Sequence, residues 1–294
     1  MSNLKVLKYP IAHRLISFLR DKDIKGVRRL SVVLPKILLP NPEKIGEHII
    51  ETLHGFKLKI NPSIDKGVEL SLFETGTYEK GILFFLKDVL KQGDCFVDVG
   101  ANIGLMSIYA AKCIGDQGTV LAFEAHPETF KWLNFNIELN HVSTVRSYDF
   151  ALGSETATTF IYDNWQINRG GASLIVKNED SKSYSINVKK LDDCLPQNHF
   201  PKVIKVDVEG FELEVLKGAT QTIENCKPIL IIELSSLRTN QYEIEDIIQF
   251  IEKFEFYQLF KLKGTKERIS KLVQINSRAD LPEHDNIICI PVKY

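Results

Sequence analysis

The sequence predicts an α/β protein in which a mainly parallel β-sheet is covered by helices on both faces. Short apolar runs alternate with stretches of helical periodicity from about residue 93 onward, as expected for successive strand and helix units. The first of these runs ends directly at Gly100, which is typical of a buried parallel strand that leads into a tight turn. The 294 residues are 44% apolar and 26% charged, a composition that supports a normal globular core.

Net charge and cysteine content narrow the classes of function. The formal net charge is −1, so the chain lacks the overall positive charge of a nucleic-acid-binding protein, and no nucleic-acid partner is expected. The five cysteines are odd in number and are not spaced as a metal knuckle, which indicates free thiols in a reducing compartment. Neither a transmembrane stretch nor a signal peptide is recognisable, and the cytoplasm is the expected location.

Residues 1–45 are predicted to form a basic amphipathic extension. The first forty residues carry nine Lys and Arg against two Asp, and apolar residues alternate with them at roughly helical spacing. Such a helix can lie peripherally on an anionic membrane surface, or it can dock on the domain that follows. The sequence leaves both alternatives open.

Residues 46–92 are interpreted as a lead-in region before the alternating domain. Phe56–Ile60 is predicted as a short strand. Gly76–Leu90 is predicted as a helix, with Tyr78 and Glu79 in its first turn.

Residues 93–294 divide into regular elements in chain order. Helices are predicted at Leu105–Cys113, Pro127–Asn140, Glu209–Asn225 and Glu243–Phe254. Strands are predicted at Cys95–Val99, Val120–Glu124, Val145–Leu152, Thr158–Tyr162, Ser185–Lys189, Lys202–Asp207, Ile229–Glu233, Tyr257–Lys261 and Asn286–Pro291. The last two strands are expected to pair as an antiparallel ribbon, and the loop 164–173 is a candidate lid over an acceptor.

The most informative motif runs from Asp98 to Gly104, between the first strand and the first helix of this domain. Glycines at such a turn let the backbone approach a ligand closely. The motif departs from a dinucleotide-binding fingerprint, because Asn102 takes the place of a glycine and Asp98 ends the strand. A carboxylate there would repel a pyrophosphate but suits a ligand with a cationic amine and a sulfonium, such as S-adenosyl-L-methionine. We therefore assign Asp98, Gly100, Asn102 and Gly104 to the methionine and ribose end of this cofactor.

A second acid ends the next strand. Glu124 lies 20 residues after Gly104, where a carboxylate can accept hydrogen bonds from both ribose hydroxyls. Ala125 and His126 follow in the same loop, and we assign them to the cofactor site as well.

The third strand also carries an acid near its end. Asp149 could accept the adenine amino group, and Phe150 and Ala151 could complete the adenine pocket. The side chain of Phe150 or a neighbouring backbone amide would then contact the base.

The junction Ile204–Gly210 brings a lysine and two carboxylates to the same edge of the sheet. These carboxylates could hold the methionine amine, orient an acceptor hydroxyl or ligate a divalent metal. We assign Lys205, Asp207 and Glu209 as catalytic candidates and assign no metal site. An alternative for Glu209 is a charge at a helix N-terminus that offsets the helix dipole.

These motifs together resemble those of FkbM-type methyltransferases that depend on S-adenosylmethionine. The matching stretches are Thr77–Glu79, Phe96–Gly104, Ala122–Pro127, Ala151–Leu152, Leu191–Asp193, Ile204–Ala219 and Asn286–Pro291. The resemblance implies a Rossmann-like class I methyltransferase fold with a seven-stranded sheet and an antiparallel C-terminal strand. It also implies O-methylation of a hydroxyl on a sugar, glycan or other natural-product acceptor, and it places Tyr78 and Glu79 at the cofactor site. It covers residues 76–292 and leaves the extension 1–45 unassigned.

Two other classes of function remain as alternatives. An NAD-dependent oxidoreductase would account for the glycine turn and for Glu124, but its pyrophosphate would face Asp98. A non-catalytic binding module could keep the same fold as a scaffold. Against it stand the several carboxylates at successive strand ends, which a scaffold alone has no physical reason to keep.

Overall fold

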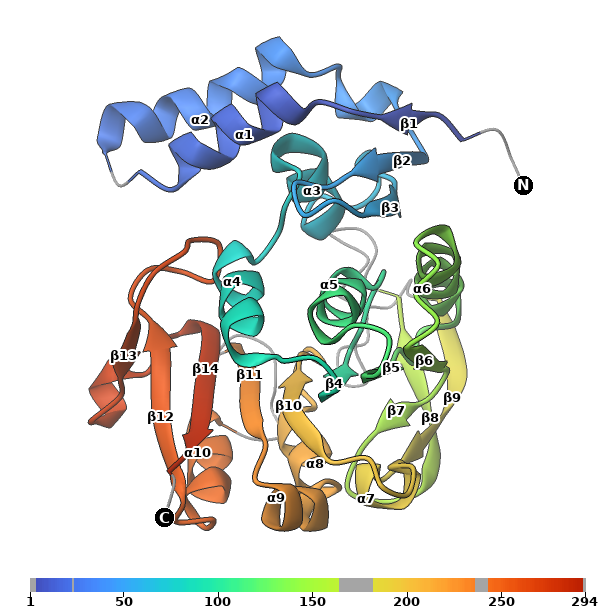
Figure 1. The fold of residues 1–294 in the computed structure, drawn as a ribbon, viewed down its shortest axis with the longest axis vertical. Helices are drawn as coiled ribbons and strands as arrows, with labels where there is room; N and C mark the ends of the chain where they lie inside the picture. The colour runs from blue at the N-terminus through green and yellow to red at the C-terminus, as the bar shows by residue number, and fades with distance from the viewer. Residues whose placement is uncertain (1–3, 23, 164–181, 236–242, 293–294) are drawn as a thin grey trace.

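The computed structural model describes residues 4–22, 24–163, 182–235 and 243–292. Its main body is an eight-stranded sheet in the order β13-β12-β14-β11-β10-β4-β5-β6 (Figure 1). The strands in chain order are β4 (Cys95–Val99), β5 (Thr119–Phe123), β6 (Val145–Tyr148), β10 (Pro201–Val206), β11 (Ile229–Ser235), β12 (Tyr257–Leu262), β13 (Leu272–Gln274) and β14 (His284–Pro291).

Strand direction follows the prediction of a mainly parallel sheet with an antiparallel C-terminal part. The strands β6, β5, β4, β10 and β11 are parallel neighbours. β14 then runs antiparallel to β11 and pairs with β12 as the predicted ribbon. The short β13, which the sequence did not predict, adds an eighth strand at the edge beside β12. The Rossmann-like fold class is therefore confirmed.

Two hydrophobic cores lie on opposite faces of this sheet. One contains residues of α4 (Lys80–Val89), α5 (Leu105–Ile114) and α6 (Pro127–Leu139). The other contains residues of α8 (Glu212–Lys217), α9 (Thr220–Cys226) and α10 (Ile244–Glu252). Phe96 packs in the first core and its neighbour Val97 in the second. Because successive side chains of a strand point to opposite faces, these apolar runs are buried on both sides.

Two smaller sheets and an N-terminal helical hairpin surround the main body. β7 (Ala151–Leu152), β8 (Ala157–Tyr162) and β9 (Ser183–Lys189) form one sheet, with the four-residue helix α7 (Leu191–Cys194) after it. β1 (Val6–Leu7), β2 (His48–Glu51) and β3 (Lys57–Ile60) form the other. The helices α1 (Pro10–Arg20), α2 (Lys25–Leu38) and α3 (Val68–Thr75) lie next to it, at one end of the molecule (Figure 1). Single 3-10 turns occur at Pro42–Lys44 and Arg278–Asp280.

Three predicted elements differ from those in the structure. The strand predicted at Val145–Leu152 is two strands, β6 and β7, which belong to different sheets. The helix predicted at Glu209–Asn225 is interrupted at Gly218, where an added Cβ would lie 1.8 Å from the carbonyl oxygen of Gly153. The helix predicted from Gly76 begins only at Lys80, because Gly76 adopts a left-handed conformation and ends α3.

The end of β4 passes unusually close to the end of β10. Gly100 has φ +83°, and a Cβ added there would lie 1.9 Å from the carbonyl oxygen of Asp207. The backbone N–H of Asp207 also donates to the carbonyl oxygen of Val99 at 3.0 Å. Only glycine fits both the conformation and the space at this position. The contact brings the two acid-bearing strand ends, at Asp98 and Asp207, side by side.

We expect Gly100→Ala to lower the free energy of unfolding by about 3 kcal/mol, because backbone strain and overlap with the Asp207 carbonyl act together. Urea denaturation measures the change. Gly55→Ala is the matched control, since Gly55 has φ +76° but nothing within 4 Å of an added Cβ. Its loss should be about 1 kcal/mol, from backbone strain alone. Equal losses in both variants would contradict the close approach.

Candidate functional site

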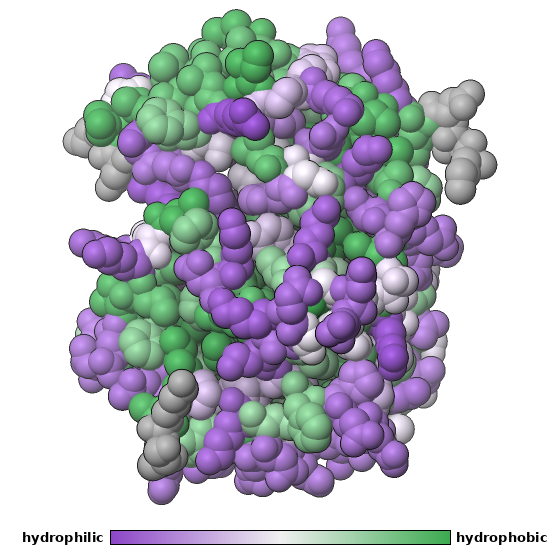
Figure 2. All heavy atoms as spheres, viewed as in Figure 1, coloured by the Kyte–Doolittle hydropathy of each residue, from purple (hydrophilic) through white to green (hydrophobic). Residues whose placement is uncertain are grey.

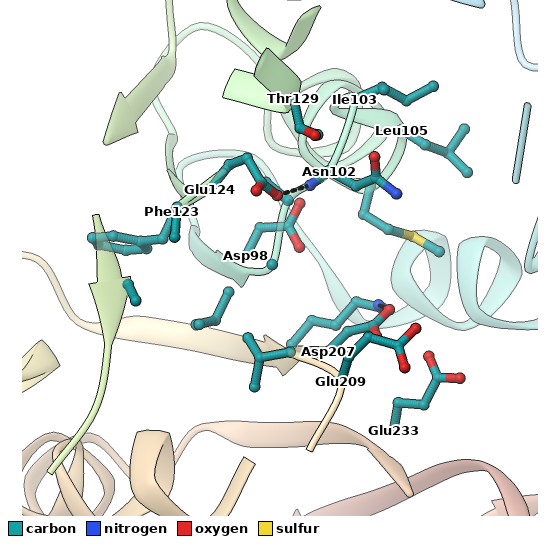
Figure 3. Close-up of a pocket in the computed structure, with 18 of the residues that line it drawn as sticks. Asp98, Asn102, Ile103, Leu105, Phe123, Glu124, Thr129, Asp207, Glu209 and Glu233 are labelled. Carbon is teal, nitrogen blue, oxygen red and sulfur yellow. Dashed lines mark hydrogen bonds and ion pairs between the residues drawn. The ribbon is translucent and has the colours of Figure 1, made fainter. Parts of the chain in front are cut away.

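A cavity opens at the carboxyl ends of the parallel strands, around the turn between β4 and α5 (Figure 3). With its open mouth it measures about 1220 Å³. Ligands of open α/β sheets bind at this edge. Six carboxylate residues line the cavity, and Lys205 is the one basic residue among its described lining residues. The acidic lining residues are Glu79, Asp98, Glu124, Asp207, Glu209 and Glu233.

Asp98 is the last residue but one of β4 and lines this cavity. It is 1% exposed and accepts a hydrogen bond from the Ser107 hydroxyl at 2.5 Å. Burial raises the pKa of Asp98 to about 6, although the nearby Lys205 acts in the opposite direction. A buried carboxylate of this kind gains from a cationic ligand, which would offset its loss of hydration.

Glu124 lies directly after β5 and faces Asp98 across the turn (Figure 3). Its two carboxylate oxygens accept backbone hydrogen bonds, one from the N–H of Asn102 and one from the N–H of His126, each at 2.9 Å. These bonds fix the direction of the side chain. Burial nevertheless raises the pKa of Glu124 to about 7. The carboxylate keeps lone pairs for a further donor such as a hydroxyl.

Asn102 is held in a strained backbone conformation at the centre of the turn. Its φ is +50°, which is uncommon for a residue other than glycine. Its Oδ1 is buried and has no hydrogen-bond partner among the residues that the structure describes. An orphaned buried acceptor beside a cavity is a place where a bound ligand can supply the missing donor. Glu79 and Glu209 line the same cavity with φ of +46° and +50°. Such strain is often concentrated at functional sites.

The predicted adenine residues divide between the cavity and the surface. Phe150 and Ala151 line the cavity, together with Leu152 and Phe123. Asp149 is exposed and does not line it. The reason is the break between β6 and β7, which turns the apolar Phe150 inward in place of the acid. An apolar wall, with the ring of Phe150 5.6 Å from that of Phe123, occupies this end of the site.

His126 and Gly104, also predicted to be cofactor residues, lie behind the cavity wall. His126 is fully buried, and its Nδ1 accepts a hydrogen bond from the backbone N–H of Thr129, which caps α6. Its Nε2 pairs with Asp163. Gly104 begins α5 with φ +93°. Both residues therefore shape the loops that carry Glu124 and Asn102, while Ala125 itself lines the cavity.

An acid–lysine cluster occupies the other end of the cavity. It consists of Glu79, Lys205, Asp207, Glu233 and Lys266. The Lys205 ammonium lies 2.7 Å from Asp207 Oδ2 and 3.7 Å from Glu79 Oε2. Lys266 lies 2.8 Å from Glu79 Oε1 and 2.6 Å from Glu233 Oε1. Carboxylate oxygens of the three acids lie within 4.8 Å of one another, a spacing that a divalent ion could bridge. In this structure two ammonium groups supply the positive charge instead.

The charges of this cluster are set by burial and by its lysines. Burial would raise the pKa of Asp207, but Lys205 and Lys266 outweigh it and lower the pKa to about 2. Burial, Asp207 and Glu79 raise the pKa of Glu233 to about 9. At neutral pH, Asp207 is thus ionised and can accept a hydrogen bond, whereas Glu233 holds a proton and can donate one.

The loop between β10 and α8 holds the remaining catalytic candidate. Glu209 lines the cavity next to Asp207. It precedes the helix by three residues, since α8 begins at Glu212, so a role at a helix N-terminus does not fit it well. Glu212 is 3% exposed and accepts a hydrogen bond from the backbone N–H of Gly210 at 3.0 Å. It braces the loop that carries Glu209.

Comparison with known proteins identifies the family. The profile of the methyltransferase FkbM domain matches residues 98–257, more than half of the chain. This chain belongs to the FkbM methyltransferase family. The matched region begins at the strand-end Asp98 and includes Glu124, Asp207 and Glu233.

Curated relatives of this FkbM-family chain are also methyltransferases. A protein of Beauveria bassiana named methyltransferase 1 is 32% identical over 143 residues, which cover 42% of this chain and 57% of the relative. The hexuronic acid methyltransferase AglP of Haloferax volcanii is 30% identical over 157 residues, 52% of this chain and 61% of the relative. This chain thus spans about three fifths of the length of these relatives.

Solved structures show weaker overall similarity to this family member. The FkbM methyltransferase of Methylobacillus flagellatus is 18% identical with a TM-score of 0.46, over 95% of this chain and 58% of that chain. An S-adenosylmethionine-dependent O-methyltransferase of Thermotoga maritima is 14% identical with a TM-score of 0.41, over 89% of this chain and 82% of that chain.

The sequence analysis of this family member did not identify Lys266, and it assigned Glu79 to the cofactor site. Lys266 follows β12 in a loop without a recognisable motif, so only the folded chain brings it beside Glu79 and Glu233. Tyr78 and Glu79, which were both predicted to be cofactor residues, line the cavity, and Glu79 belongs to the acid–lysine cluster. The candidate lid 164–173 lies outside the residues that the structure describes.

We expect Lys266→Met to lower the free energy of unfolding by about 3 kcal/mol at neutral pH, because the buried carboxylate of Glu79 would lose the ammonium group that lies 2.8 Å from it. A carboxyl group whose pKa is higher in the folded state than in the unfolded state makes stability fall as pH rises above its unfolded pKa, about 4.5. A buried carboxylate that has lost its cation is relieved when it takes up a proton. The destabilisation should therefore shrink on acidification to about pH 5.

Urea denaturation at both pH values measures this effect. The exposed Lys263, which lies in the same loop, supplies the control variant Lys263→Met. The control should change stability by less than about 0.5 kcal/mol. A pH-independent loss in Lys266→Met would contradict the proposed charge balance.

Proposed function

We propose that this chain is an S-adenosylmethionine-dependent O-methyltransferase that acts on a hydroxyl of a sugar, glycan or related natural product. The observation that carries the proposal is the anionic cavity, in which buried Asp98 and Glu124 flank a glycine turn. Such a site repels the pyrophosphate of a dinucleotide and attracts a ligand with a sulfonium and an ammonium group. The name of the AglP relative supports a sugar acid as the acceptor class.

The residues around the turn fit this cofactor. The orphaned Oδ1 of Asn102 needs a donor, and the methionine ammonium or a ribose hydroxyl can supply one. Glu124 would accept from the ribose hydroxyls, and Asp98 would face the cationic methionine end. The apolar wall of Phe123, Phe150 and Leu152 offers the flat, dry surface that adenine requires. S-adenosylmethionine would supply a methyl group on a sulfonium, which is already activated for in-line displacement.

The acid–lysine cluster would receive the acceptor. Ionised Asp207 can accept a hydrogen bond from the acceptor hydroxyl and so direct its oxygen. The hydroxyl becomes strongly acidic as its oxygen gains the methyl group, so even the weakly basic Asp207 can take the proton. Lys205 holds Asp207 in place at 2.7 Å, and protonated Glu233 can donate a hydrogen bond to a neighbouring acceptor oxygen.

Calorimetry should show binding of S-adenosylhomocysteine to the wild-type chain, and Glu124→Ala should weaken it by about 10- to 100-fold, since charge-assisted hydrogen bonds are lost. Glu128→Ala, on the adjoining turn of α6, is the matched control and should bind as the wild type does. Binding of NAD in place of S-adenosylhomocysteine would favour the oxidoreductase alternative. If Glu124→Ala bound S-adenosylhomocysteine as tightly as the wild type does, Glu124 would not bind the ribose hydroxyls.

Asp207→Asn and Glu209→Gln should reduce methyl transfer by about 100-fold, because the acceptor is no longer directed and its proton has no acceptor. The affinity for S-adenosylhomocysteine should change by less than about threefold. Transfer of a radiolabelled methyl group to hexuronic-acid oligosaccharides measures the effect, and the exposed Glu155→Gln serves as control. Unchanged turnover in both site variants would exclude them from the chemistry.

A further inference from the structure

The helical hairpin α1–α2 presents an apolar face to solvent. Of the large apolar side chains that are exposed in the described residues, most belong to this hairpin or its connecting loop. Ile11 is 82% exposed, Phe18 56%, Val32 58% and Ile37 69%. Apolar side chains gather in Figure 2 at the end of the molecule where Figure 1 places α1 and α2. A patch of this kind on a globular protein marks an interaction surface.

The exposed side chains follow helical stripes. On α1 the residues Ile11, Leu15 and Phe18 are exposed, at spacings of four and three. On α2 Leu30, Val33 and Ile37 form such a stripe, at spacings of three and four, and the exposed Val32 and Leu38 flank it. Each stripe therefore lies along one side of its helix and continues over about two turns.

Basic side chains border the same stripes. Arg14 and Lys22 are exposed beside the apolar residues of α1, and Arg29 and Lys36 beside those of α2. The Lys22 ammonium lies 4.5 Å from the centre of the Phe18 ring. Among the described residues of the hairpin, Asp21 is the only acid, and it is turned inward to pair with Lys80. The first forty residues hold nine Lys and Arg against two Asp, whereas the whole chain holds 37 against 38.

The opposite face of the hairpin is fixed to the domain. His13 and Ile16 are buried, and His13 Nε2 lies 3.0 Å from the carbonyl oxygen of Phe73 on α3. Lys80 at the start of α4 donates to the Ser17 hydroxyl at 3.0 Å. Docking on the following domain, one of the two alternatives that the sequence left open, therefore explains only the inner face of the hairpin. The outer face has no cover within the described chain.

We propose that the outer face of the α1–α2 hairpin binds an anionic lipid bilayer. An apolar stripe with Lys and Arg along its border is the pattern of a helix that lies in a membrane interface, where the apolar groups enter the acyl boundary and the cations contact lipid phosphates. A second copy of the chain fits less well. It would bring Arg14, Arg29 and Lys36 of two subunits together without acids to neutralise them. Within the described residues no helix is long and apolar enough to cross a bilayer, so binding is to the surface.

The hairpin would hold the site near the lipid surface. Lys80, which contacts Ser17 and Asp21 of the hairpin, directly follows the cavity residue Glu79. Val68 at the start of α3 also lines the cavity. The proposed bilayer face and the acceptor end of the site are therefore linked through α3 and α4.

Vesicle sedimentation with the full chain tests the proposal. The wild-type chain should pellet with vesicles of phosphatidylcholine and phosphatidylserine, and less with phosphatidylcholine alone. Raised salt should weaken binding, because it screens the charges. Each Lys or Arg near an anionic surface contributes about fivefold to partitioning. Arg14→Glu, Arg29→Glu and Lys36→Glu combined should therefore lower the partition coefficient by at least about 100-fold.

A second variant tests the apolar stripes. Phe18→Ser, Val33→Ser and Ile37→Ser combined should also abolish pelleting, because the buried apolar area in the interface is lost. All these positions are exposed, so both variants should keep wild-type affinity for S-adenosylhomocysteine and a wild-type melting temperature.

Matched controls carry the same substitutions elsewhere on the surface. The exposed Lys91, Lys112 and Lys202 are changed together to Glu, and the exposed Phe160 and Phe200 together to Ser. Both controls should pellet as the wild type does. Equal losses in the controls and the hairpin variants would overturn the proposal, as would a wild-type chain that does not pellet. A stable dimer by light scattering that the Phe18, Val33 and Ile37 changes dissolve would also overturn it, in favour of a second copy.

Discussion

The close contact between the ends of β4 and β10 is the constraint on which the site depends. Gly100 has no side chain, so its backbone can lie against the carbonyl oxygen of Asp207. The parallel register places Asp98 beside Lys205 in the sheet, one residue before the strands separate. The glycine turn between β4 and α5 and the acid–lysine cluster therefore share one wall. A bulkier residue at position 100 would push apart the two halves of the cavity.

The two ends of the cavity differ in how the negative charge of their acidic residues is compensated. At the turn, burial outweighs the available partners, and the pKa values of Asp98 and Glu124 rise to about 6 and 7. At the other end, the lysines keep Asp207 ionised. A cationic ligand would stabilise the first end by supplying the charge that the protein lacks. The second end already holds its cations, which suits the neutral hydroxyl that we propose as the acceptor.

The N-terminal hairpin adds a surface to this site without entering it. Its inner face is bonded to α3 and α4, and those helices bring Val68 and Glu79 to the cavity. Its outer face carries apolar and basic residues that the described part of the domain does not cover. Because the same segment has one face for the protein and one for solvent, docking and lipid binding are not exclusive. A methyltransferase held in this way would meet its acceptor at a membrane.

The sequence by itself determined most of the order of strands and helices from β4 to β14 and the acids near the strand ends. It could do so because apolar periodicity and glycine turns depend on residues that are close together in the sequence. It missed β13, the break between β6 and β7, and the break between α8 and α9. The resemblance to the FkbM family was likewise carried by contiguous motifs, and the family profile confirms it. Only the tertiary structure decided that Asp149 faces solvent, that Glu79 joins Asp207 and Glu233, and that Lys266 lies beside Glu79 and Glu233. Glu79 and Lys266 are 187 residues apart in the sequence. Their contact depends on how distant loops pack together, so a local sequence pattern cannot predict it.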